Sequence, residues 1–117
     1  MLHEMNLYPE SYLAIKNKTK TVEMRLHDEK RALIHPGDVI CFRNTETKEC
    51  LQVLVLKTKV FQDFYELYSH FDKVSIGYEP EELASPRDME LYYKKEDIEK
   101  YGAFAITIQL MEENKYQ

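Results

Sequence analysis

The chain has 117 residues, of which 44% are hydrophobic, and this length predicts one domain over residues 1–117 and excludes a large multidomain enzyme. The longest apolar run, residues 103–111, is too short to cross a bilayer, and the first ten residues lack the basic and apolar regions of a secretory signal. The net charge of -5 argues against a general polyanion binder, and we expect a cytoplasmic protein without a membrane anchor.

Charge is divided unevenly along the sequence. Residues 1–60 carry 10 basic and 8 acidic side chains, a sum of +2, whereas residues 61–117 carry 6 basic and 13 acidic side chains, a sum of -7. Any anion site is therefore expected in the first half, where basic residues crowd between Lys16 and Arg31. The same cations also suit an ordinary solvated surface. The acidic second half is a candidate surface for a protein partner.

The first predicted elements are a strand and a short helix. A strand is expected around residues 3–7, and Pro9 suits the first turn of the helix that follows. The helix is predicted to end near Asn17, because Asn tolerates the left-handed backbone conformation that a helix C-cap needs.

β-branched residues and alternation then predict a strand over residues 19–26. Glu23 and Arg25 are two positions apart, so they lie on one face of this strand. Strict alternation places Lys20 on the opposite face. A site that combines these three side chains therefore requires Lys20 to lie at an irregular entrance to the strand.

Two further strands are predicted in the middle of the chain. Pro36 and Gly37 form a turn that leads into a strand at residues 38–42. The polar run at residues 44–49 is typical of a hairpin loop, and a long strand follows at residues 51–60. This strand is apolar on both faces, which indicates that it is covered on each side for part of its length.

The second half predicts helices and a final strand. Aromatic side chains at helical spacing form one apolar stripe, at Phe61, Phe64, Tyr65 and Tyr68. Ser85 caps a helix that runs from Pro86 to about Tyr93. A further helical turn over residues 95–101 stops at Gly102, and residues 103–111 alternate as a strong final strand.

The order of these elements predicts the α+β class. Strands lie at both ends of the chain, and the βαβ unit of a doubly wound parallel sheet is not repeated. We expect a small, largely antiparallel, barrel-like sheet decorated by short helices.

The densest chemical signal is the stretch from residue 18 to residue 25, which contains Lys20, Thr21, Glu23 and Arg25. Arg25 can give a planar pair of donors to a phosphate or a base edge, Lys20 gives a compact charge, and Glu23 accepts from exocyclic amino groups. Together they suit a polar ligand that makes several hydrogen bonds. The structural alternative is a surface pair of Glu23 and Arg25, which contributes little energy.

A second signal is aromatic. Tyr78, Tyr92 and Tyr93 carry flat rings that can stack on bases and hydroxyls that can hydrogen-bond. The chain has 9 tyrosines and no tryptophan, so the same residues also fit a core with polar tips.

The sequence predicts no metal and no cofactor. Cys41 and Cys50 lack a paired spacing, and the 4 histidines are dispersed, so neither residue type forms a ligand pattern. Both cysteines are expected to be free thiols that are buried or half-buried. No serine-hydrolase elbow and no phosphate-binding Walker loop is present.

Three separated pieces in the right order resemble the ASCH family, named for activating signal cointegrator homology. They are the K-T-x-E-x-R strand at residues 20–25 within IKNKTKTVEMR, the Gly-Asp turn of HPGDVICF, and the Tyr-Gly entry to the last strand in YYKKEDIEKYGAFAITI. The resemblance covers nearly the whole chain.

The resemblance implies a PUA-like β-barrel decorated by helices, with a cleft that binds RNA or nucleotides. By this resemblance Lys20, Glu23 and Arg25 face the ligand, and Asp38 fixes the turn at Gly37. The far wall of the cleft is expected from the segment between Tyr78 and Glu82. The leading hypothesis is therefore a small module that binds RNA or a modified nucleoside.

A related bacterial branch is similar to small amidohydrolases that remove the acetyl group from N4-acetylcytidine with a Lys, a nearby Thr and a later Glu. Lys20 matches the Lys, but Glu23 occupies the Thr position, so Thr21 or water would have to replace the nucleophile. The later Glu has three candidates, Glu79, Glu81 and Glu82. An enzyme in which Lys20 and Glu23 are catalytic is thus the alternative to a binding module.

Overall fold

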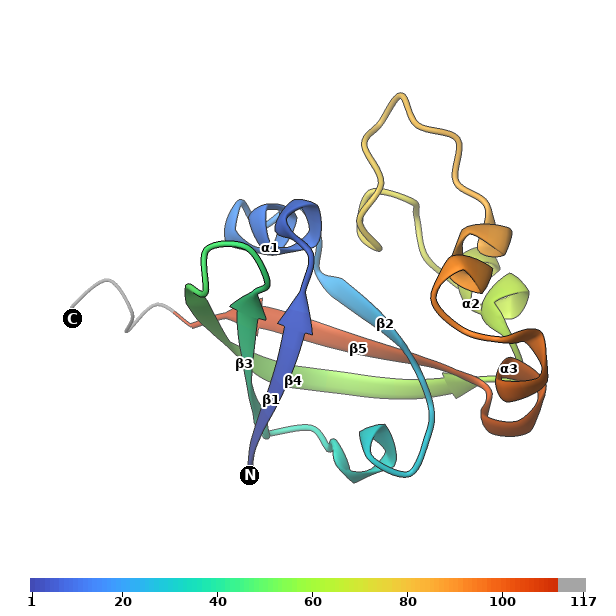
Figure 1. Cartoon of the computed structure of the whole chain (residues 1–117), viewed down its shortest axis with the longest axis horizontal. Helices are drawn as coiled ribbons and strands as arrows, with labels where there is room; N and C mark the ends of the chain where they lie inside the picture. Colours follow the sequence, from blue (N-terminus) through green and yellow to red (C-terminus); the bar gives the residue numbers. More distant parts are fainter. Residues whose placement is uncertain (112–117) are drawn as a thin grey trace.

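The computed structural model describes residues 1–111, which form one curled sheet with short helices around it (Figure 1). The five strands lie in the order β1 (Leu2–Leu7), β3 (Val39–Asn44), β4 (Cys50–Phe61), β5 (Ala103–Leu110) and β2 (Val22–Leu26). Among the strand pairs within residues 1–111, β1 and β3 alone are parallel, and the other three pairs are antiparallel. The sheet is a half-barrel, which confirms the prediction of a PUA-like α+β fold.

The curl of the sheet centres on β4. Its first residues pair with β3, and its stretch from Val53 to Phe61 pairs with β5. The register against β5 shifts between Val55 and Lys57, and such a bulge bends the strand that carries it. The two edge strands, β1 and β2, are bridged by a side chain: the Nη2 of Arg25 donates to the carbonyl oxygen of Asn6 at 2.7 Å.

Two apolar clusters cover the sheet. One includes Ile40, Phe42 and Val53, with Tyr12 and Ile15 of helix α1 (Pro9–Lys16). The other joins β2 and β5 to helices α2 (Phe64–His70) and α3 (Lys95–Tyr101) through Phe64, Leu67 and Ile98, and it includes Met89 of the segment between these helices. Residues 103–106 of β5 are all buried, because this central strand is covered on both faces.

The start of β1 and the turn before β3 meet at one carboxylate. Asp38 accepts from the backbone N–H of His35 at 3.0 Å, the Nε2 of His3 at 2.9 Å and the N-terminal amine at 3.1 Å. The hydrogen bond from His3, followed by those from His35 and the N-terminus, lowers the pKa of Asp38. Asp38 therefore holds the turn at Gly37, as the family resemblance implies.

The helix ends differ from the predictions in detail. Asn17 caps α1 with a right-handed backbone, and the left-handed residue is the next one, Lys18, at φ 67°. The segment at Pro86–Leu91 is a 3₁₀ helix, capped by Ser85, and it ends before Tyr93 because the chain turns there to reach α3.

The apolar stripe is also corrected. Phe61 is the last residue of β4 rather than part of a helix, and Tyr65 is 56% exposed. The buried face of α2 consists of Phe64 and Leu67. The helix begins at Phe64, so the residue one turn later, Leu67, shares its face. Cys41 is half-buried as expected, but Cys50 is exposed at the beginning of β4.

Within residues 1–111, every helix is too short or too polar to cross a bilayer.

Gly102 joins α3 to β5 and packs closely against the end of β4. It has φ 82°, and a Cβ there would lie 2.7 Å from the carbonyl oxygen of Phe61. We expect Gly102→Ala to lower the free energy of unfolding by at least about 2 kcal/mol, through backbone strain and this clash. Urea unfolding measures the loss.

Gly37→Ala is the matched control, because Gly37 also has a positive φ, 94°, but a Cβ at this position would have no atom within 4 Å. Only strain remains there, and the loss should be about 1 kcal/mol. Equal losses for the two variants would contradict the tight contact between Gly102 and the end of β4.

Candidate functional site

A buried ion network lies at the entrance to β2. The Nζ of Lys20 is 2.7 Å from Oε1 of Glu23, and the Nε of Arg25 is 2.7 Å from Oε2 of the same carboxylate. Lys20 and Glu23 are 6% and 3% exposed, and the Arg25 side chain is 14% exposed. The sequence named all three residues, and the structure brings them together.

The approach of Lys20 to Glu23 depends on the irregular backbone before β2. The strand begins only at Val22, so the alternation of strand faces does not extend back to Lys20. The backbone N–H of Lys20 donates to Ala14 in α1, and the N–H groups of Thr21 and Val22 both donate to the carbonyl oxygen of Ser75. These bonds fix the turn that directs Lys20 inward.

The two cations keep the carboxylate ionised. Burial by itself would raise the pKa of Glu23, but the charges of Lys20 and Arg25, with their hydrogen bonds, lower it overall. Burial likewise lowers the pKa of Arg25, and the neighbouring Glu23 more than reverses this and raises it. At neutral pH Glu23 is therefore an ionised carboxylate held between two basic side chains.

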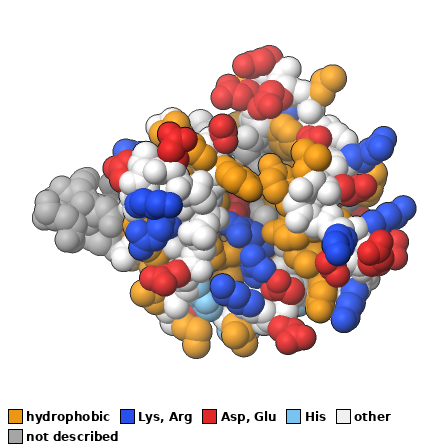
Figure 2. All heavy atoms as spheres, viewed as in Figure 1, with side chains coloured by type: hydrophobic (Ala, Val, Ile, Leu, Met, Phe, Trp, Pro, Cys, Tyr) orange, Lys and Arg blue, Asp and Glu red, His pale blue; other side chains and the backbone are white. Residues whose placement is uncertain are grey.

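The network forms the floor of a cleft of about 550 Å³. One wall is the chain from Asn6 to Ala14, and the other is the segment from Ile76 to Tyr93. In Figure 2, Lys and Arg side chains lie in a hollow near the middle of the molecule, beside a border of hydrophobic side chains.

Gly77 shapes the cleft through its contact with Lys20. It has φ 115°, and a Cβ there would lie 3.2 Å from Cδ of Lys20. The residue therefore lets the backbone of the 76–78 segment pass close to the lysine side chain. In the sequence this glycine indicates only a turn, because nothing in the pattern links it to Lys20.

The tyrosines of the cleft have different roles. The hydroxyl of Tyr78 is 2.8 Å from the hydroxyl of Tyr68 and donates to Asp88 at 2.7 Å. Burial, with the bonds to Tyr68 and Asp88, raises the pKa of Tyr78. Its hydroxyl thus holds the 78–88 segment in place, and only the rest of the side chain is left for a ligand.

Tyr92 and Tyr93 face different surroundings. Tyr92 is 57% exposed, and its ring centroid is 6.1 Å from that of Tyr8, so the two rings flank the opening of the cleft. Tyr93 lines the cleft but stacks on Phe64, with the ring planes 2° apart. Tyr8 was not identified from the sequence as a residue of the cleft, because no motif around it distinguishes it from the other tyrosines.

Some expected site residues lie elsewhere. Thr21 is exposed and does not line the cleft, because it follows Lys20 on the outer side of the turn. Of the three late glutamates, Glu79 and Glu82 line the cleft and Glu81 does not. Ser11, which the sequence did not indicate, accepts a hydrogen bond from Lys20 at 3.2 Å.

The cleft as a whole is acidic. Its ionisable lining, tyrosines aside, consists of two cations, Lys20 and Arg25, and four carboxylates, Glu10, Glu23, Glu79 and Glu82. Two carboxylates of the second half, Glu79 and Glu82, thus border this cleft. Use of the acidic second half by a protein partner stays a prediction. Glu112 and Glu113, which contribute to the acidic second half, lie outside the described residues.

A metal centre would need several ligating side chains close together. Across residues 1–111, the side chains of His, Cys, Asp and Glu form no group of three or more that could hold a metal ion.

Comparison with known proteins identifies the family. The family model described as ASCH domain matches residues 5–112. The chain belongs to the ASCH domain family. This ASCH domain is similar to the solved structure of hypothetical protein PH0355, with 32% identity, 95% of this chain and 100% of that chain covered, and a TM-score of 0.81.

Two other solved structures extend the comparison. Protein PF0455 from Pyrococcus furiosus is 34% identical over 96% of this chain and 99% of that chain, with a TM-score of 0.73. The ASCH protein from Zymomonas mobilis, in its S128A mutant form, is 19% identical over 92% of this chain and 67% of that chain, with a TM-score of 0.68, and shows the shared fold. No curated protein matches the sequence.

The ionised state of Glu23 generates a prediction on acid stability. Because its pKa is lowered on folding, Glu23 contributes stability above its ordinary pKa of 4.5, and this contribution is lost as the pH falls through the folded value. Glu23→Gln should lower the free energy of unfolding at pH 7 by about 3 kcal/mol, since it leaves two buried cations without their carboxylate. It should also flatten the pH dependence of stability below pH 4.5.

Urea unfolding from pH 7 down to pH 3 measures both effects. Glu99→Gln is the control, because Glu99 is an exposed carboxylate on α3. Its stability curve should run parallel to that of the wild type. A Glu23→Gln curve that is also parallel to the wild type would show that Glu23 is not held ionised by its neighbours.

Proposed function

We propose that this ASCH domain binds a single base of RNA, or a free nucleoside, in the cleft above Lys20, Glu23 and Arg25. The observation that carries the proposal is the fixed ion network at the floor of the cleft. Buried ion networks add little stability compared with well-packed apolar side chains, so a network in this position is better explained by ligand recognition.

The network keeps hydrogen-bonding capacity for a ligand. Lys20 uses two of its three N–H donors, on Glu23 and Ser11. Arg25 uses its Nε on Glu23 and its Nη2 on the carbonyl oxygen of Asn6. The remaining N–H donors of Lys20 and Arg25 lie beside the carboxylate oxygens of Glu23, which accept. The edge of a base has ring acceptors and amino donors, so it can pair with both kinds of group.

The size and the rim of the cleft suit one nucleoside. Its volume of about 550 Å³ is within the range of small-ligand sites. Tyr8 and Tyr92 offer exposed rings at the opening, where a splayed base can stack. The excess of carboxylates disfavours a phosphate inside the cleft, so the base rather than the backbone is the group that enters.

Tyr92→Ala tests the stacking part of this proposal. Loss of the ring should weaken binding of a nucleoside by about tenfold, which is the effect of losing one stacked base. Isothermal titration calorimetry with the four ribonucleosides and N4-acetylcytidine measures it.

Tyr65→Ala is the matched control. Tyr65 is as exposed as Tyr92, at 56% against 57%, but it lies on α2 and does not line the cleft. Its removal should leave the affinity unchanged. Equal effects of the two substitutions, or no binding by the wild type of any nucleoside, nucleotide or oligoribonucleotide, would contradict the proposed site.

An amidohydrolase that acts on N4-acetylcytidine is the second candidate, and the contact between Lys20 and the Ser11 hydroxyl favours it. The hydroxyl is a polar group of the kind that acyl transfer uses, next to a cation that can stabilise developing negative charge. Binding is the stronger proposal, because Glu23 has a lowered pKa and both of its oxygens are engaged, which makes it a weak base.

Chromatography after incubation with N4-acetylcytidine separates the two candidates. An enzyme should release cytidine and acetate, and Ser11→Ala should abolish the release without abolishing nucleoside binding. Cytidine at no more than the level formed with Lys20→Ala would leave binding as the function.

A further inference from the structure

A second cavity lies on the other side of Arg25 and has the opposite charge to the cleft. Its volume is about 320 Å³. The charged side chains that line it are Glu4, Arg25, Lys30, Arg31 and Arg43. We propose that this cavity, named the basic pocket, binds a phosphate group joined to the nucleoside whose base lies in the cleft. The inference rests on the proposed function and adds to it the place of the backbone phosphate.

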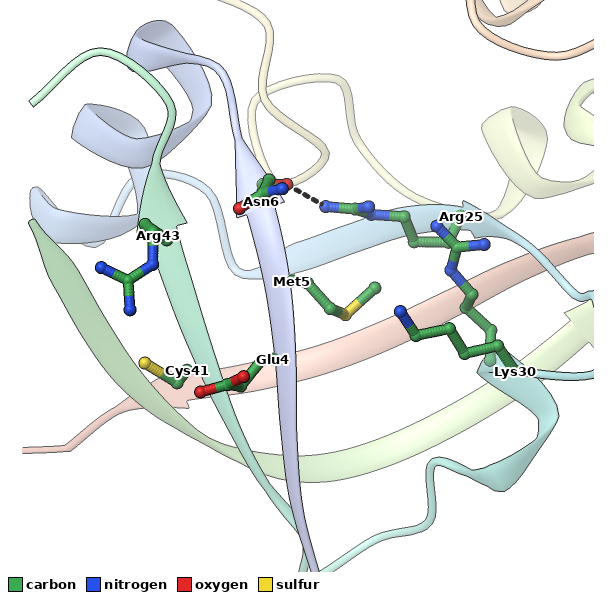
Figure 3. Close-up of a pocket in the computed structure, with 8 residues that line it drawn as sticks. Glu4, Met5, Asn6, Arg25, Lys30, Cys41 and Arg43 are labelled. Carbon is green, nitrogen blue, oxygen red and sulfur yellow. Dashed lines mark hydrogen bonds between the residues drawn. The ribbon is translucent and has the colours of Figure 1, made fainter. Parts of the chain in front are cut away.

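The basic pocket is built by two separate parts of the chain. Residues Asn6 and Arg43 are register partners of the parallel pair β1 and β3, as are Glu4 and Cys41, so these side chains share one face of the sheet. The other part is the loop after β2, which supplies Lys30 and Arg31. Figure 3 shows Arg25 and Lys30 on one side of β1, and Cys41 and Arg43 on the other.

The pocket keeps an excess of positive charge after its ion pairs are counted. Asp28 pairs with Arg31, and Glu23 is shared between Arg25 and Lys20. The lining and these partners therefore comprise five cations, Lys20, Arg25, Lys30, Arg31 and Arg43, and three carboxylates, Glu4, Glu23 and Asp28. All five cations lie in the first half of the chain, where the sequence predicts any anion site.

Several donors of the pocket lack protein acceptors. The Nε of Arg31 is buried and has no hydrogen-bond partner within the described residues. A buried donor without an acceptor is costly, and a phosphate oxygen would supply one once the Arg31 side chain turns its Nε toward the pocket. The ammonium of Lys30 forms no ion pair within residues 1–111, and Arg43 donates only its Nη1, to the carbonyl oxygen of Lys48.

Arg25 connects the two cavities. It lines both, with its Nε on Glu23 toward the cleft and its Nη2 on the carbonyl oxygen of Asn6 in β1 (Figure 3). A ligand that places its base over the ion network and its phosphate in the basic pocket would cross this guanidinium. The acidic cleft repels phosphate and the basic pocket attracts it, so the charges also set the direction of the bound nucleotide.

Calorimetry on the full chain tests the inference by adding phosphate to the same nucleoside. The ribonucleoside that binds best is compared with its 5′- and 3′-monophosphates and with a short single-stranded oligoribonucleotide of the same base, at constant ionic strength. A gain with a monophosphate identifies a terminal phosphate as the ligand, and a gain with the oligoribonucleotide alone identifies a phosphodiester. We expect at least one of these ligands to bind about tenfold more tightly than the nucleoside, from charge-assisted hydrogen bonds.

Variants of the pocket locate the gain. Lys30→Glu and Arg43→Gln should each remove most of the gain and leave the affinity for the nucleoside unchanged. Lys95→Glu is the matched control, because Lys95 is an exposed lysine on α3 that lines neither cavity. It should keep the full gain. Thermal unfolding of each variant checks that the fold is intact.

The outcomes separate the two proposals. Nucleoside binding with no gain from phosphate, or a gain that survives both pocket substitutions, would overturn the basic pocket and leave the cleft. Absence of binding by every nucleoside, monophosphate and oligoribonucleotide would overturn the proposed function, and the basic pocket with it.

Discussion

One carboxylate placed between two cations is the interaction on which the site depends. Glu23 is almost fully buried, and its charge is tolerable there only because Lys20 and Arg25 each lie 2.7 Å from one of its oxygens. The two cations are held in place by different parts of the chain. Lys20 is directed inward by the turn between α1 and β2, and Arg25 is held by the carbonyl oxygen of Asn6 across the open side of the half-barrel.

The same arrangement connects the fold to recognition. Arg25 bridges the edge strands β1 and β2 and also lines both the acidic cleft and the basic pocket. The charges of this acidic protein are divided between two cavities, and the proposed anion site depends on that division. In the proposed function, this division of charge favours one nucleotide over an extended RNA strand, because binding along a strand needs a continuous track of cations.

Much of the fold follows from local patterns in the sequence. All five strands lie close to their predicted positions, since alternation and turn residues are local signals. The buried face of α2 was predicted wrongly, because the helical spacing of aromatic residues begins at Phe61, and Phe61 is the last residue of β4. The 3₁₀ form of Pro86–Leu91 was missed because the capping Ser85 and Pro86 favour either kind of helix.

The site was predictable only where its residues are neighbours in sequence. Lys20, Glu23 and Arg25 lie within six positions, and the family resemblance adds the prediction that they face a ligand. Ser11 and Gly77 reach the same cleft through tertiary packing against Lys20, for which the sequence has no local signal. Thr21 was placed in the site by its position between these residues, but a turn at the strand entrance directs it to solvent.

Contact between a bound base and the ion network can be observed directly by nuclear magnetic resonance. Arginine Nε–H signals report on the guanidinium itself, and Arg31, in the loop after β2, supplies a comparison signal away from the cleft. Titration with a nucleoside should shift the Nε–H signal of Arg25 and the backbone amide of Gly77, and leave the Nε–H of Arg31 in place. A nucleoside that binds without shifting the Arg25 signal would show that the base does not contact the ion network.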